Sequence, residues 1–301
     1  SIDLSKGHSF PLKLDFNRYN ENQSFDGLKK LNLNNNFNGP PLTIVRDFLS
    51  YNAWREFGVA ASRTSFARVT VNQEDLGLYV LVEQVDGDFI QGHFNEPYGD
   101  LYKPEQISGT LEYRGGSIAD YPDIGHKWPD ESNHSSLLNA LEVLNSGQPG
   151  DIGTVFDIES VLTYLAGNVA LGSADYYPNT GHNYYLYEEL PGRFHMLPWD
   201  MNGSQEAMNP SLCSPISGFL SRKLLEDPFH EARYLEILSE FLSTAGSVDQ
   251  LSSRLNDARK LLGSEFPNED FDGLQQDIIS RVDWLKSELA STSGCMIQAP
   301  E

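Results

Sequence analysis

Residues 173–204 constrain the fold more than any other part of the chain, because they hold a hydrophobic hairpin pattern. The stretches 184–187 (YYLY) and 194–197 (FHML) are rich in aromatic and branched residues. Pro191-Gly192 lies between them and is a typical turn former. Residues of this kind bounded by turn formers favour paired strands. The pattern therefore predicts a β-hairpin late in the chain.

Asp175 and Asn183 precede this predicted hairpin and Asp200 follows it, so the turn brings the three side chains close together. Mg²⁺ binds one or two carboxylates and takes its other ligands from water and substrate phosphates. We interpret Asp200 as a metal ligand and Asp175 as the group that accepts or orients an acceptor hydroxyl proton. Asn183 either holds the metal or braces Asp175. Asn179 lies in the same loop, and spacing alone does not separate the two asparagines.

Two lysines are candidate phosphate contacts. Lys13 is central in FPLKLDF, where it either reaches a cleft or faces solvent from a half-buried strand. Glu83 is its expected ion-pair partner, at the end of an apolar strand. Lys103, after Leu101-Tyr102, is a second candidate cation for a nucleotide.

Periodicity predicts a strand-rich first part and a helical second part. The predicted strands are 10–16, 28–33, 65–71 and 76–82, with a helix over 42–57 and a short helix over 88–94. Residues 110–131 are rich in glycine, proline and aspartate and are predicted to be surface loop. The predicted helices that follow are 135–144, 158–171, 218–225, 229–244, 248–262 and 274–289. We expect an α+β, two-lobed fold with an N-terminal lobe over 1–131 and a C-terminal helical lobe over 132–301.

Charge and hydropathy exclude some partners. With 43 acidic and 21 basic residues, the net charge of -22 disfavours binding to nucleic acid or to an anionic membrane. No apolar run reaches the ~18 residues that span a bilayer. Residues 1–3 (SID) do not resemble the start of a signal peptide, so localisation is inferred indirectly.

Cys213 and Cys295 are the two cysteines of the chain and do not form a CxxC pair. A zinc site is therefore not expected. In a secreted protein the two would form a disulfide that ties the C-terminal tail to the loop after the metal site, with a stabilisation of ~4 kcal/mol. The alternative is two free thiols.

Several common enzyme motifs are missing. Neither GxxxxGK[ST] nor GxGxxG occurs, which excludes a simple P-loop or Rossmann site. His-Arg-Asp, Asp-Phe-Gly and the GxSxG elbow are also absent.

Together the motifs resemble the spore coat protein H (CotH) kinases, an atypical and secreted-type branch of the protein kinase fold. The similarity runs through most of the chain. Its segments are LKKLNLNNNF, LTIVRDFLSYNAWREFGVAASR, VTVNQEDLGLYVLVEQVDGDFI, GDLYK, NYYLY, MLPWDMNGS and GFLSRKLLEDPFHEARYLEIL.

The resemblance implies an extracellular or cell-surface kinase that binds ATP and Mg²⁺ and transfers phosphate to serine or threonine of a protein. Asp175 would be the catalytic aspartate, and Asn183 and Asp200 would hold Mg²⁺. The nucleotide contacts would be Lys13, Glu83 and Lys103. Two alternatives stay open at this point: transfer of AMP or another group by the same fold, and a catalytically silent binding module.

Overall fold

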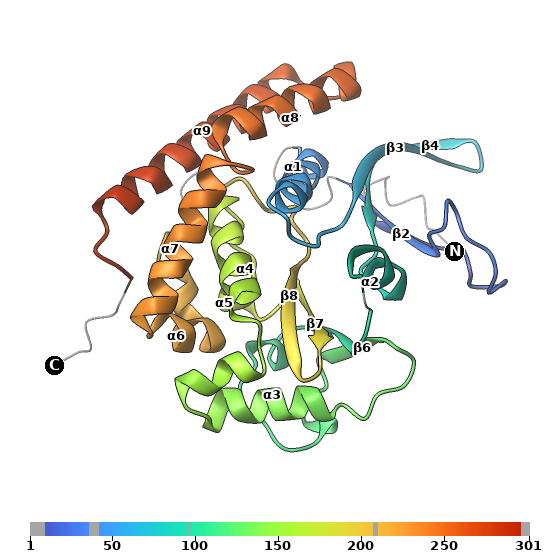
Figure 1. Cartoon of the computed structure of the whole chain (residues 1–301). Helices are drawn as coiled ribbons and strands as arrows, with labels where there is room; N and C mark the ends of the chain where they lie inside the picture. Colours follow the sequence, from blue (N-terminus) through green and yellow to red (C-terminus); the bar gives the residue numbers. More distant parts are fainter. Residues whose placement is uncertain (1–9, 36–41, 96, 207–209, 296–301) are drawn as a thin grey trace.

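The computed structural model describes residues 10–35, 42–95, 97–206 and 210–295. These residues form two antiparallel four-stranded sheets and the helices α1 to α9 (Figure 1). The mixed α and β content of the expected fold is confirmed. Its two-lobed, kinase-like arrangement stays a prediction.

The first sheet contains the N-terminal strands. Their order is β1 (Leu12–Asp15), β2 (Lys30–Asn34), β4 (Glu74–Glu83), β3 (Thr64–Val71). In β2 the leucines alternate with polar residues, and Leu31 and Leu33 are buried as the alternation predicts. Helix α1 (Thr43–Glu56) contacts β3 and β4, and α2 (Gly87–His93) follows β4. The predicted strands and both predicted helices of this region are therefore confirmed, whereas Pro40-Pro41, expected to open α1, lie outside the described residues.

The second sheet contains the predicted hairpin. Its order is β6 (Ile124–Trp128), β5 (Leu101–Pro104), β7 (Tyr184–Leu190), β8 (Arg193–Pro198). β7 and β8 pair with Tyr184 opposite Pro198, and Pro191-Gly192 lies in the turn.

The expectation of loop over 110–131 is wrong at β6. The sequence IGHKW of β6 has no alternation, so its strand conformation depends on pairing with β5 rather than on its own pattern. β5 and β6 precede residue 131 but share a sheet with β7 and β8, so residue 131 does not separate the two sheets. The division into 1–131 and 132–301 stays a prediction.

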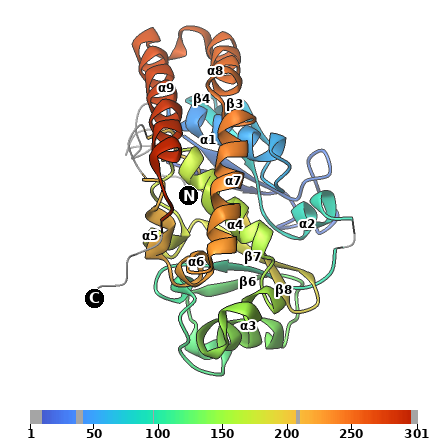
Figure 2. The ribbon, with the colours of Figure 1, turned by 60° about the vertical axis from the view of Figure 1, so that its left-hand side comes forward.

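Helices cover the second half of the chain. Figure 2 shows α3 and β6 at the opposite end of the molecule from the connection between α8 and α9. The bounds are α3 (Ser135–Ser146), α4 (Ile158–Ala170), α5 (Tyr177–Thr180), α6 (Phe219–Leu225), α7 (Pro228–Ser243), α8 (Val248–Leu262) and α9 (Asn268–Ser291). The six predicted helices are confirmed. α9 begins six residues earlier than predicted, directly after Pro267, and α5 was not predicted.

One hydrophobic core joins α1 to the later helices. Trp54 of α1 is fully buried, with its ring centroid 5.5 Å from that of Phe241 in α7 and 6.5 Å from that of Tyr164 in α4. Gly167 makes this approach possible, because a Cβ at this position of α4 would overlap the Trp54 ring. The N-terminal sheet is therefore connected to the helices through α1.

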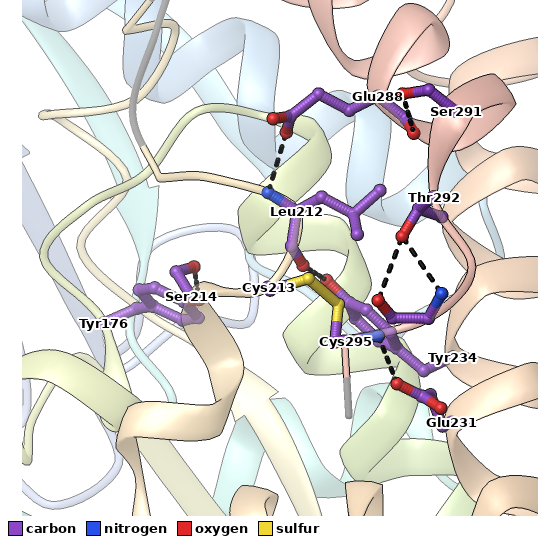
Figure 3. Close-up of a disulfide and its surroundings, with 11 residues drawn as sticks. Tyr176, Leu212, Cys213, Ser214, Glu231, Tyr234, Glu288, Ser291, Thr292 and Cys295 are labelled. Carbon is purple, nitrogen blue, oxygen red and sulfur yellow. Dashed lines mark hydrogen bonds between the residues drawn. A yellow bond between two sulfur atoms is a disulfide. The ribbon is translucent and has the colours of Figure 1, made fainter. Parts of the chain in front are cut away.

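A disulfide joins Cys213 to Cys295, with the two Cα atoms 5.2 Å apart (Figure 3). The neighbouring Leu212 donates its N–H to Glu288 of α9 at 3.2 Å and accepts the Tyr234 hydroxyl of α7 at 2.7 Å. Of the two alternatives for the cysteines, a disulfide or two free thiols, the structure contains the disulfide. It fixes the segment after Asp200 against α7 and α9.

Candidate functional site

The open end of the β7–β8 hairpin places Asn183 beside Asp200. Asn183 precedes the first paired residue of β7, and its carbonyl accepts the N–H of Trp199 at 3.3 Å. Asn183 and Asp200 both have left-handed backbones, with φ of 64° and 54°. This conformation is uncommon outside glycine, although Asn and Asp adopt it more readily than most residues, and strained backbone is concentrated at functional sites.

Asp175 lies next to this pair. The Asn183 amide Nδ2 donates to the Asp175 backbone carbonyl at 2.7 Å, and His182 Nε2 is 3.4 Å from Asp175 Oδ1. The Asp175 side chain is 57% exposed and therefore accessible to a substrate. The structure thus brings the three predicted residues together, and the bond from Asn183 supports the bracing role considered for it.

Asn179 uses both ends of its amide elsewhere. Its Nδ2 donates to the Ala174 carbonyl at 2.9 Å, and its Oδ1 accepts the Ser217 hydroxyl at 2.9 Å. Asn183 Oδ1, in contrast, makes no hydrogen bond within the described residues. Asn183 is therefore the better of the two as a metal ligand.

The electrostatics of Asp200 suit a cation. Burial raises the pKa of Asp200, and the negative charge of Asp175 adds to the increase, while Lys103 and His182 oppose it. Lys103 Nζ is 2.6 Å from Glu105 Oε1 and 6.0 Å from the centroid of the Trp199 ring. Lys103 is therefore close to Trp199, the residue before Asp200, and near enough for its charge to act on Asp200.

Lys13 and Glu83 do not form the expected ion pair. Lys13 is in register with Asn32, and Asn32 with Val82, so Glu83, one residue further along β4, faces the other side of the sheet. Lys13 Nζ instead donates to Gln84 Oε1 at 2.7 Å. Burial lowers the pKa of Lys13, and the positive charge of Lys30 lowers it further.

Glu83 is held by two other side chains. Arg63 Nη2 is 2.6 Å from Oε1, and Arg63 Nε and His93 Nε2 are 3.0 and 3.2 Å from Oε2. Burial would raise the pKa of Glu83, but the hydrogen bonds from His93 and Arg63 outweigh it and hold the pKa at about 2. Glu83 therefore links β4 to the segment before β3 and to α2.

Sequence reasoning missed Asp47, which is completely buried on α1. Its Oδ2 accepts the Asn34 amide at 3.2 Å, and its Oδ1 has no hydrogen-bond partner within the described residues. Burial and the negative charge of Asp200 raise the pKa of Asp47 to about 8. The sequence feature that could have indicated Asp47 is an acidic residue within a predicted helix that is otherwise rich in apolar residues.

These residues fit a magnesium ion. Among the described residues Asp47 Oδ1 is buried without a hydrogen-bond partner, and the charge of Asp200 acts on Asp47. Asn183 is joined to the residue before Asp200 by the backbone hydrogen bond from Trp199. Within the described residues no three His, Cys, Asp or Glu side chains form a preformed metal cluster. Mg²⁺ needs few protein ligands, because it keeps several waters and phosphate oxygens as ligands.

A cavity of about 370 Å³ adjoins the loop between Asp175 and Asn183. Its walls come from α5, from residues 106–112 and from the start of α6. Another cavity of about 810 Å³ is lined by the end of α1 and by parts of α2, α4, β8 and α7, but by none of the predicted site residues. The smaller cavity is not lined by Asp175, Asn183 or Asp200 either, but its wall includes Tyr177 to Gly181, which lie between Asp175 and Asn183 in the chain.

Comparison with known proteins gives the family of the chain. Residues 3–287 match the family CotH kinase protein, so the chain belongs to this family. Inner spore coat protein H of Bacillus subtilis (strain 168) is 22% identical over 260 residues, which cover 77% of this chain and 67% of that protein.

One chain from a solved structure of the Shewanella oneidensis MR-1 toxin–antitoxin system HipA, HipB and its operator DNA complex is similar to this protein. The alignment covers 93% of this chain and 65% of the chain in that structure. The identity is 11% and the TM-score 0.42. Family membership supports a kinase-type activity. Among the described residues, no helix combines the length and the apolar character needed to cross a membrane.

Proposed function

We propose that this protein is an ATP- and Mg²⁺-dependent protein kinase that transfers phosphate to serine or threonine of another protein. The observation that carries the proposal is the convergence of Asp175, Asn183 and Asp200 at one end of the hairpin. Membership of the CotH kinase family supports it.

Asp200 and Asn183 would hold Mg²⁺, which would neutralise charge on the phosphates as the reaction proceeds. Lys103 would contact the same phosphates, and the effect of its charge on Asp200 supports this role. Lys13 would also contact the nucleotide phosphates; it donates to Gln84, whose amide donates to the Tyr185 hydroxyl of β7 at 3.2 Å. Glu83 acts in this proposal by fixing the end of β4, not by pairing with Lys13.

Asp175 would act on the acceptor. The acceptor hydroxyl oxygen forms a bond to the γ-phosphorus of ATP, while its proton passes to the Asp175 carboxylate. The bond from the γ-phosphorus to the bridging oxygen breaks, and ADP leaves with the electron pair. The exposure of Asp175 supports this role, because a macromolecular acceptor must reach it. The cavity of about 370 Å³ beside the loop is where we place the acceptor segment.

The disulfide between Cys213 and Cys295 supports an extracellular or cell-surface location, since disulfides persist in oxidising compartments. The similarity to a spore coat protein is in line with this location. The net charge of -22 supports a protein partner over nucleic acid or an anionic membrane.

The test is mass spectrometry of serine- and threonine-containing peptides incubated with ATP and Mg²⁺. We expect peptides that gain the mass of one phosphate with the wild type and not with Asp175→Asn. Asp175→Asn should retain binding of ATP with Mg²⁺, because Asp175 is not a proposed metal ligand. Peptides that gain the mass of AMP would replace phosphate transfer by nucleotide transfer, and unmodified peptides throughout would favour a silent binding module.

A further inference from the structure

Asp47 is a buried carboxylate that the described residues do not neutralise. Its side chain is 0% exposed, and no cation of the described residues forms an ion pair with it. Neighbouring Arg46 is directed elsewhere, with its guanidinium on the Ser204 and Gln205 carbonyls and on Asp277. A carboxylate buried without a counter-charge is strongly unfavourable.

The groups that face Asp47 come from three elements. Asn34 of β2 donates to it at 3.2 Å, and the backbone N–H of Met201 acts on it from the segment after β8. Tyr51, one turn later on α1, accepts the N–H of Asp200 at 2.9 Å. Burial raises the pKa of the Tyr51 hydroxyl, and the charges of Asp47 and then Asp200 raise it further, so both carboxylates lie near this hydroxyl.

The two carboxylates therefore both lie near the Tyr51 hydroxyl, and Asp47 Oδ1 has no hydrogen-bond partner among the described residues. An acidic pair with a buried free oxygen is a suitable environment for a hard divalent cation, which accepts carboxylate oxygens and neutralises both charges. The cations that act on Asp200, namely Lys103 and His182, do not appear among the groups that act on Asp47.

We propose that Asp47 is an additional ligand of the divalent cation at Asp200, and that α1 and the segment after β8 hold this ion before nucleotide binds. The inference rests on the proposed function only through Asp200. Its consequence is that Mg²⁺ or Mn²⁺ connects α1, and with it the N-terminal sheet, to the end of the hairpin.

The experiment is a titration of nucleotide-free protein with Mn²⁺, followed by electron paramagnetic resonance of the free ion. We expect wild type to bind one Mn²⁺, and Asp47→Asn to weaken binding by at least about tenfold, since even groups that only support ligands cost this much. Asp130→Asn is the matched control, because Asp130 is exposed and forms no ion pair or side-chain hydrogen bond with another described residue; it should bind as wild type does.

Thermal unfolding separates a metal ligand from a structural residue. Asp47→Asn without metal should be at least as stable as wild type, because it removes a carboxyl whose ionisation is opposed by burial and by the charge of Asp200. It should, however, lose the increase in Tm that Mn²⁺ gives to wild type. Wild-type Mn²⁺ affinity in Asp47→Asn would overturn the proposal, as would equal destabilisation of this variant with and without metal. If wild type transfers phosphate and Asp47→Asn binds Mn²⁺ normally, the metal role of Asp47 is refuted and the proposed kinase function stands. If wild type binds Mn²⁺ through Asp47 but transfers no phosphate, the kinase function is refuted and the metal role of Asp47 stands.

Discussion

Replacing Glu83 by Gln tests the role that the structure gives to this residue. Glu83 is 3% exposed and its pKa is held at about 2 instead of the ordinary 4.5. A difference of this size corresponds to about 3 kcal/mol at 1.36 kcal/mol per pKa unit. Arg63 is 55% exposed and partly screened by water, so we expect Glu83→Gln to lower the free energy of unfolding by about 2 kcal/mol near pH 7.

The pH dependence follows from the direction of the shift. Because the pKa of Glu83 is lower in the folded state, its stabilisation is complete above about pH 4.5 and is lost as the pH falls toward about 2. Urea unfolding of wild type and Glu83→Gln, followed by circular dichroism, should therefore give a difference that is constant near neutral pH and shrinks in acid. Glu142→Gln, an exposed change on α3, is the control. A difference below about 0.5 kcal/mol near pH 7, or one that does not change with pH, would refute the reasoning.

Three further changes probe the same account. Replacing Cys213 and Cys295 together by Ser should lower the free energy of unfolding by about 2 to 5 kcal/mol, and reductant should affect urea unfolding of wild type but not of this variant. Tyr51→Phe removes the acceptor of the Asp200 N–H and should cost about 1 to 3 kcal/mol by urea unfolding; an unchanged midpoint would contradict that contact. Lys13→Met should weaken ATP binding about tenfold by calorimetry, and equal affinity would remove Lys13 from the nucleotide site.

The hairpin and its acidic residues could be predicted because their information is local. Aromatic strands, a Pro-Gly turn and the flanking positions of Asp175 and Asp200 are all visible within residues 173–204. The helices other than the short α5 were predictable for the same reason, because the spacing of apolar residues within each segment indicates its buried face.

Features that depend on pairing between distant segments could not be predicted. β6 carries Gly125 and Lys127 and becomes a strand only because β5 is beside it. The partner of Glu83 depends on the register of β4 in its sheet, because a shift of one residue moves a side chain to the other face of the sheet. The proximity of Asp47 to Asp200 joins positions more than 150 residues apart and has no local pattern.

Calorimetric titration of ATP into the protein, with and without Mg²⁺, tests the central claim most directly. Wild type and Asp130→Asn should bind ATP saturably only when Mg²⁺ is present, and Asp200→Asn should lose the Mg²⁺-dependent binding. Equal binding by Asp200→Asn, or no binding by wild type under either condition, would contradict the account of this site as a metal-dependent nucleotide site.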